Sequence, residues 1–176
     1  MNTIPRRDFI SQFSLASLSL LATHPLFGKT AKSGDRKSVL VETAHFANLG
    51  GWMLDNQFEP HLGFSYLIAH GLGKPVENAQ AEMRFPKAGR YNVWALTKDW
   101  CPGEWQAPGQ FNIRLGKQTL KETFGTKADW TWQSGGTVDV SADQLYTTIA
   151  LEDLTGFEGR CSAVYFSLDA NDTPPI

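Results

Sequence analysis

Residues 81–97, AEMRFPKAGRYNVWALT, are the stretch that decides the fold. From Ala81 to Phe85, apolar side chains alternate with charged ones, which is the period-two pattern of a strand with one buried face. The next residues, Pro86 to Gly89, are typical of a turn. The apolar run from Tyr91 to Thr97 is therefore predicted to return beside the first strand as its hairpin partner.

Similar short apolar runs continue along the chain, separated by Gly, Pro and Asp, and no long stretch has the helical period. They are residues 39–41, 66–69, 111–115, 119–121, 138–140, 146–151 and 163–168. With the two strands within residues 81–97, they make about nine strands. The sequence therefore predicts an all-β domain, an antiparallel two-sheet β-sandwich of jelly-roll type, in preference to an open barrel.

The composition bounds the class of protein. The 176 residues carry a net charge of −2 and the basic residues are scattered singly, so no nucleic-acid partner is indicated. Six Trp and 11 Phe are many for this length, and several of the Trp lie beside Gly, Pro or Asp. Aromatic side chains in such turn-like sequence indicate a binding surface or plugs at the ends of the sandwich.

The first 28 residues are predicted to be an export leader. Arg6 to Phe9, Arg-Arg-Asp-Phe, precede a modest apolar run, Ile10 to Ala22, that is shorter than the roughly 20 residues of a permanent membrane helix. The arrangement resembles a twin-arginine signal, which implies export in the folded state to the periplasm or the cell exterior. An ordinary secretory leader is the alternative. The expected parts are residues 1–28 as signal, 29–37 as polar hinge, 38–169 as sandwich, and 170–176 as a tail or the start of a linker.

Known catalytic and metal-binding motifs are missing from the sequence. Cys101 and Cys161 lack a zinc spacing, and they either pair or stay as free thiols. No glycine-rich turn leads from a strand into a helix, as a dinucleotide site requires, and neither Gly-x-Ser-x-Gly nor His-Glu-x-x-His occurs. Paired carboxylates could still hydrolyse a substrate, but carboxylates are ordinary in number here. The sequence favours binding over catalysis.

Three segments combine aromatic rings with hydrogen-bonding groups in predicted loops: residues 99–105, 129–133 and 153–160. Loops gather at the two ends of a sandwich, so these segments could share one surface. A sugar site needs this mixture, because a flat ring packs on the apolar side of the sugar while polar groups meet its hydroxyls. The candidate ligand-binding residues are Asp99, Trp100, Trp105, Trp130, Trp132, Asp153, Arg160 and His70.

Each tryptophan also has a purely structural interpretation. Trp130 and Trp132 have the same parity and could both point into the core. Trp100 and Trp105 are the pair expected to be exposed.

Several segments in a fixed order resemble jelly-roll carbohydrate-binding modules. They are Val41 to His45, Gly50 to Trp52, Gly89 to Trp94, and Cys161 to Phe166. Three further segments look like a module that accompanies FAD-dependent oxidoreductases in exported bacterial proteins: Asn48 to Trp52, Ala69 to Gly73, and Asp153 to Phe157. In the sugar-binding families, a Glu-x-Glu in the first strand helps to hold a structural calcium. Here Glu42 is kept and Ala44 replaces the second glutamate, which removes a ligand.

The resemblance implies an exported, non-catalytic carbohydrate-binding or accessory module with a glycan as partner. It implies no cofactor beyond a structural calcium at Glu42, and FAD only through an oxidoreductase partner protein. The alternatives are a subunit or fragment of an FAD-dependent oxidoreductase, and a structural protein-interaction domain. No flavin-contacting motif of such enzymes has a counterpart in this sequence.

Overall fold

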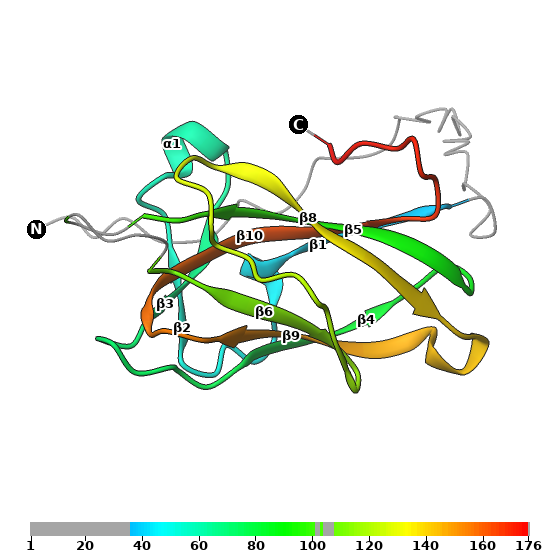
Figure 1. Cartoon of the computed structure of the whole chain (residues 1–176), viewed down its shortest axis with the longest axis horizontal. Helices are drawn as coiled ribbons and strands as arrows, with labels where there is room; N and C mark the ends of the chain where they lie inside the picture. Colours follow the sequence, from blue (N-terminus) through cyan, green and yellow to red (C-terminus); the bar gives the residue numbers. More distant parts are fainter. Residues whose placement is uncertain (1–35, 101–102, 104–107, 176) are drawn as a thin grey trace, which may run out of the picture. The chain divides into compact units, whose positions relative to one another are not determined.

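Two antiparallel sheets face each other and enclose the core (Figure 1). The computed structural model describes residues 36–100, 103 and 108–175. The predicted leader, most of the predicted hinge, Cys101 and Trp105 lie outside the described residues. The all-β, two-sheet antiparallel sandwich predicted from the sequence is confirmed.

Sheet A is built around its central strand, β10. The sheet comprises β1 (Ser38–Glu42), β2 (Trp52–Asp55), β3 (Tyr66–His70), β5 (Gly89–Lys98), β8 (Thr131–Val140) and β10 (Phe157–Ser167). Along one edge, β10 pairs with β5, which pairs in turn with β8. Along the other edge, β10 pairs with β1 at its C-terminal end and with β3 at its N-terminal end, and β3 pairs with β2. Three separate parts of the sheet are therefore joined by one strand.

Sheet B is smaller and runs in the order β4, β9, β6, β7. These strands are β4 (Ala79–Arg84), β6 (Phe111–Leu115), β7 (Gln118–Thr119) and β9 (Tyr146–Asp153). Helical structure in the described part is limited to short pieces, which are Thr43–His45, Glu59–Leu62 (α1) and Ala142–Gln144. No helix in the described ranges has the length and apolar character needed to cross a membrane.

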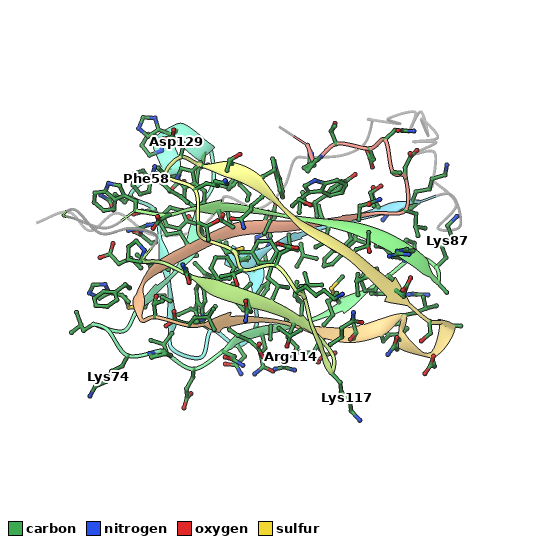
Figure 2. All side chains as sticks on the ribbon, viewed as in Figure 1. Phe58, Lys74, Lys87, Arg114, Lys117 and Asp129 are labelled. Carbon is green, nitrogen blue, oxygen red and sulfur yellow. The ribbon has the colours of Figure 1, made fainter. Side chains whose placement is uncertain are left out.

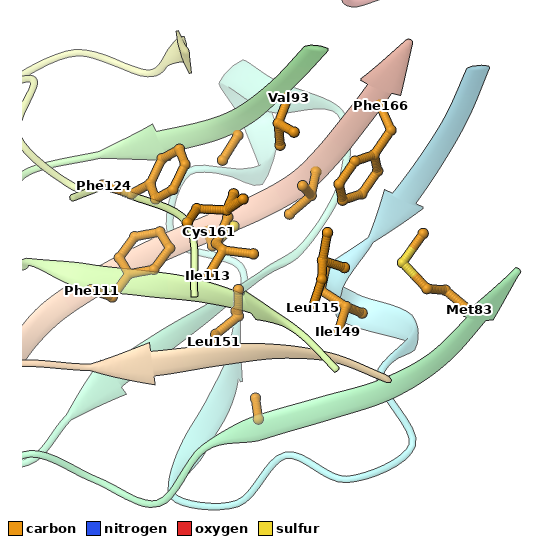
Figure 3. Packing of buried hydrophobic residues seen from close by; sticks show 14 of the residues in the cluster. Met83, Val93, Phe111, Ile113, Leu115, Phe124, Ile149, Leu151, Cys161 and Phe166 are labelled. Atoms are coloured by element: carbon orange, nitrogen blue, oxygen red, sulfur yellow. The ribbon is translucent and has the colours of Figure 1, made fainter. Parts of the chain in front are cut away.

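Alternating side chains of both sheets fill the space between them (Figure 3). Phe111 is fully buried in this core, and its ring centroid lies 5.7 Å from that of Phe124 and 5.5 Å from that of Trp52. Phe85 packs against Tyr91 and Phe166 nearby. The period-two pattern read from the sequence is the pattern of this core.

The predicted hairpin within residues 81–97 is wrong. β4 pairs with β9 in sheet B, whereas β5 pairs with β10 and β8 in sheet A. Alternation determines which face of a strand is buried but not which strand lies beside it. The side chains of Phe85 and Tyr91 both enter the core, with ring centroids 4.7 Å apart, so the turn at Pro86 carries the chain across the core from one sheet to the other.

Two of the predicted loops are largely strand. β8 begins at Thr131 and β10 at Phe157, so residues 131–133 and 157–160 belong to sheet A, and β2 was not predicted. Two glycines, Gly135 and Gly136, make the first part of β8 look like a turn in the sequence. A Cβ at Gly135 would come 2.6 Å from the ring of Phe124, and Gly136 has a φ of +73° where the β5–β8 register shifts.

Cys161 is a free cysteine buried in the core. Burial raises the pKa of its thiol, so the reactive thiolate is disfavoured.

Candidate functional site

A row of side chains crosses the outer face of sheet A, the face turned away from sheet B. Strand register places Glu42 beside Ala163, Ala163 beside Leu96, and Leu96 beside Trp132. Residues paired in this way project from the same face of a sheet. The row crosses four strands. Three inter-strand spacings separate its two ends, so the row is roughly 14 Å long. Ala163 and Leu96 lie in the middle of this row and do not project far from the sheet. They form the middle of the floor of a groove.

This outer groove has a volume of about 650 Å³. We define it by its floor, Glu42, Ala163, Leu96 and Trp132, and by two walls that stand on either side of this row. The remaining lining residues are Leu40, His61, Leu62, Phe64, Trp130, Thr131 and Pro175. In Figure 1, α1 and the C-terminal segment both lie on the outer side of sheet A.

The first wall is the connection between β2 and β3. The Asp55 carboxylate accepts hydrogen bonds from the backbone N–H groups of Asn56 and Gln57, which turns the chain out of β2. α1 then lasts a single turn, because Gly63 adopts the left-handed conformation with a φ of +80° and ends it. The helix and the residues after it present His61, Leu62 and Phe64 to the groove.

Phe58 anchors this wall to sheet A. We call Phe58, Tyr66, Trp100 and Trp130 the aromatic cluster, because the ring of Phe58 lies 5.8–6.2 Å from each of the other three. Tyr66 and Trp130 also meet at 4.9 Å. Figure 2 shows Phe58 near Asp129 at the α1 end of the sandwich, far from Lys87. The cluster holds the wall in place and gives Trp130 one side packed against protein and another toward the groove.

A buried guanidinium supports the aromatic cluster from below. Arg160 is only 1% exposed, and its guanidinium lies 5.6 Å from the Phe58 ring and 5.1 Å from the Trp100 ring. It donates to the Glu158 carboxylate at 2.7 Å, to the Glu158 carbonyl at 2.9 Å, and to the carbonyl of Trp100. Glu158 also contacts Nδ1 of His70 at 3.4 Å. Arg160 thus connects the start of β10 to the end of β5.

Tyr66 closes the other side of the cluster. Its hydroxyl donates to the Asp55 carboxylate. Burial and the adjacent Asp55 carboxylate raise the pKa of Tyr66 to about 12, so the phenol keeps its proton and remains a donor.

The second wall is the C-terminal segment, Asp169 to Pro175. The Asp172 carboxylate accepts hydrogen bonds from the hydroxyls of Tyr165 and Ser167, each at 2.7 Å. These two donors hold the pKa of Asp172 below its usual value. Further along, the indole N–H of Trp132 donates to the Pro175 carbonyl at 3.1 Å. The segment is therefore attached to β10 and to β8.

The structure distributes the predicted site residues over several places. Trp130, Trp132 and Glu42 line the outer groove, and the hypothesis that both tryptophans are core residues is wrong. Trp100, which is 37% exposed, and Arg160 belong to the aromatic cluster and its support, and Asp99 precedes Trp100 with its backbone N–H bonded to the Lys127 carbonyl. His70 is exposed beside Glu158. Trp105 lies outside the described residues.

Asp153 has a different position. It is buried, and its carboxylate accepts hydrogen bonds from the backbone N–H groups of Val76 at 2.9 Å, Gly156 at 3.1 Å and Thr155 at 3.2 Å. These bonds tie the turn before β10 to the loop before β4. A ligand-binding role for Asp153 remains a prediction, and the residue is not among those that line the groove.

Several groove residues were missed in the sequence. Leu96 and Ala163 look like ordinary strand residues, and Phe64 and Pro175 lie in segments without a recognisable motif. Leu96 and Ala163 come together through the register of β10 with β5, which no local pattern reveals.

A calcium site at Glu42 remains a prediction. Its carboxylate lies 3.0 Å from Nδ1 of His45. Among the residues that the structure describes, no group of three or more His, Cys, Asp or Glu is placed to hold a metal ion. Calcium takes six to eight oxygen ligands, so Glu42 alone does not make such a site.

Comparison with known proteins agrees with this architecture. No protein-family model and no curated protein matches the chain. Among solved structures, it is similar to the Podospora anserina GH26-CBM35 β-(1,4)-mannanase, with 14% identity and a TM-score of 0.57 over 78% of this chain and 29% of that one. It is also similar to a native family 35 carbohydrate binding module from Clostridium thermocellum, with 13% identity and a TM-score of 0.56 over 74% and 98% of the two chains.

A third similar structure is the CBM36-1 domain of a multidomain xylanase from the hindgut metagenome of Trinervitermes trinervoides. Its identity is 12% and its TM-score 0.52, over 76% of this chain and 98% of that one. The chain thus spans less than a third of the mannanase and almost the whole of each isolated module. Likeness at this identity defines the fold, which is the β-sandwich of carbohydrate-binding modules of families 35 and 36.

Proposed function

We propose that this chain is a non-catalytic carbohydrate-binding module that holds a glycan in the outer groove. The observation that carries the proposal is the pairing of Trp130 and Trp132 with polar groups in one depression on this fold. Aromatic faces pack against the apolar C–H side of a sugar ring, while Glu42 and His61 can exchange hydrogen bonds with its hydroxyls. The neighbouring folds bear the names of modules from a mannanase and a xylanase, which supports the same ligand class.

Binding without catalysis is favoured by the groove's own side chains. Glu42 is the one carboxylate among the residues that line it. Hydrolysis of a glycosidic bond commonly needs two carboxyl groups, about 5–10 Å apart, on either side of the bond. A single carboxylate at one end of the floor suits recognition of hydroxyl groups.

The first test is a Trp132→Ala substitution. We expect it to weaken binding of a soluble mannan or xylan by about 2 kcal/mol, or roughly thirtyfold in Kd, because a stacking ring in a binding site carries much of the binding energy. Affinity electrophoresis and calorimetry would measure the loss. Tyr146→Ala is the matched control, since Tyr146 is 69% exposed on β9 in the other sheet and should leave the Kd unchanged. Equal affinities for wild type and Trp132→Ala would refute a site at this groove.

A second component of the proposal is an exported accessory role beside a flavin-dependent oxidoreductase. It is supported by the twin-arginine pattern at Arg6 to Phe9 and by the resemblance of Asn48 to Trp52 and of Asp153 to Phe157. The expected result is that the purified chain binds glycan, has no flavin absorbance, and is exported in bacteria with an active twin-arginine pathway. Flavin that co-purifies with the chain would favour an enzyme subunit, and glycan-independent capture of protein would favour an adhesion domain.

A further inference from the structure

The C-terminal segment follows sheet A without joining it. After Leu168, whose backbone N–H still bonds to the Lys37 carbonyl, none of the described residues 169–175 belongs to a strand. Its attachments to sheet A are the Asp172 carboxylate, bonded to Tyr165 and Ser167, the backbone N–H of Asp169, which donates to the Ser167 hydroxyl at 3.1 Å, and the Pro175 carbonyl, bonded to Trp132. Each attachment uses a side chain of the outer face of sheet A. The segment therefore covers part of the outer face of sheet A without being a strand of the sheet.

The position of the segment is set by the row of side chains next to the groove floor. Tyr165 pairs with Trp94 in strand register, one step along β10 and β5 from Ala163 and Leu96. The centroid of the Tyr165 ring lies 6.0 Å from the centroid of the Trp94 ring and 6.4 Å from that of the Trp132 ring. The Tyr165 and Trp94 rings form the base on which the segment rests, and this base adjoins Trp132 on one side of the floor.

The opposite side of the floor is bounded by α1 and the aromatic cluster. Trp130, which directly precedes β8, and Lys98, the last residue of β5, lie there, and Lys98 Nζ is 5.3 Å from the Phe58 ring. His61 and Leu62 rise above them. The floor thus runs across the strands between two walls. One wall is the connection between β2 and β3, and the other is the C-terminal segment.

From this geometry we infer that the C-terminal segment is a specificity-determining wall of the glycan site, and that the groove accepts an unbranched glycan chain and rejects a branched one. The inference rests on the proposed function. A linear chain can lie along the row from Glu42 to Trp132 with its ring faces toward Leu96 and the tryptophans. A side sugar that projects sideways from that chain meets His61 and Leu62 on one side or Pro175 on the other.

Asp172 has a positioning role in this arrangement. Its carboxylate is the attachment nearest to the middle of the segment, and it accepts hydrogen bonds from the hydroxyls of Tyr165 and Ser167. Without it, the segment is held in its second half by the bond from Trp132 to Pro175 alone. Loss of this carboxylate should therefore release the wall while leaving the floor and the other wall as they are.

The test compares linear and branched ligands on three forms of the full chain. The ligands are linear β-1,4-mannan and β-1,4-xylan oligosaccharides and their counterparts with single-sugar branches. The forms are wild type, Asp172→Ala and a chain that ends at Ala170. We expect wild type to bind linear ligands at least about tenfold more tightly than branched ones, and both variants to bring the two Kd values within about threefold by strengthening the branched complex.

Asp143→Ala is the matched control, because Asp143 is an exposed carboxylate bonded to the Ser141 hydroxyl at 2.6 Å and is not among the groove residues. It should keep the wild-type preference. Wild type that binds linear and branched ligands equally would overturn the inference while leaving the proposed function intact, as would variants that keep the full preference. Absence of binding to every glycan by wild type would overturn both. Thermal unfolding of each form separates a released wall from an unfolded sandwich.

Discussion

Substitution of Arg160 by alanine is expected to lower the free energy of unfolding by about 3–5 kcal/mol, because it removes one partner of a buried ion pair. The Arg160 side chain is 1% exposed, and its bonds to Glu158 and to the Trp100 carbonyl would all be lost together. The Glu158 carboxylate would remain largely buried without its cation. The space below the Phe58 and Trp100 rings would also be emptied.

Denaturant titration of the purified chain, followed by tryptophan fluorescence, measures this effect. Arg160→Lys should recover only part of the loss, since an ammonium group lacks the flat guanidinium that reaches several acceptors. Arg84→Ala is the control: Arg84 is exposed and lies 4.9 Å from the Tyr146 ring, so its removal should change stability by no more than about 0.5 kcal/mol. Similar losses for Arg160→Ala and Arg84→Ala would contradict the structural role of Arg160.

The other large effect is expected from Phe111→Ala, again about 3–5 kcal/mol. Phe111 is fully buried, and its ring contacts both Phe124 and Trp52. Alanine would leave a cavity between the two sheets that rigid strands on both sides cannot close. The midpoint of denaturant unfolding should fall while the slope stays the same.

Leu72→Ala provides the comparison for this substitution. Leu72 is 79% exposed in the loop after β3, so its truncation removes almost no buried surface and should cost at most about 0.5 kcal/mol. A small effect of Phe111→Ala, close to that of Leu72→Ala, would mean that the core does not centre on this ring.

The sequence predicted the strands well because most of them bury one face. In β4 and β6, apolar residues alternate with polar ones because one face of each strand is buried. The sequence could not reveal that β4 and β5 belong to different sheets, because the same alternation serves any neighbour and Pro86 to Gly89 suits a crossing as well as a hairpin. It revealed only residues 138–140 of β8, because Gly135 and Gly136 in the first part of that strand are needed for the Phe124 ring and for a bulge but look like a turn.

Only some of the residues that line the groove could be predicted from the sequence, for a related reason. Trp130 and Trp132 are conspicuous residue types, and the sequence alone marks them as candidates. Leu96, Ala163 and Pro175 become groove residues only through strand register and through the course of the C-terminal segment. Long-range geometry of this kind leaves no periodic signal in a single sequence.

The central place of β10 has a consequence for how the protein is made. Translation produces β10 after every other strand of the sandwich, yet β10 is the one that joins β1, β3 and β5. Until β10 leaves the ribosome, β1, β3 and β5 lack the strand that joins them. Sheet A therefore cannot be completed before β10 has been synthesised, and its many pairings between distant residues favour folding in milliseconds to seconds rather than microseconds.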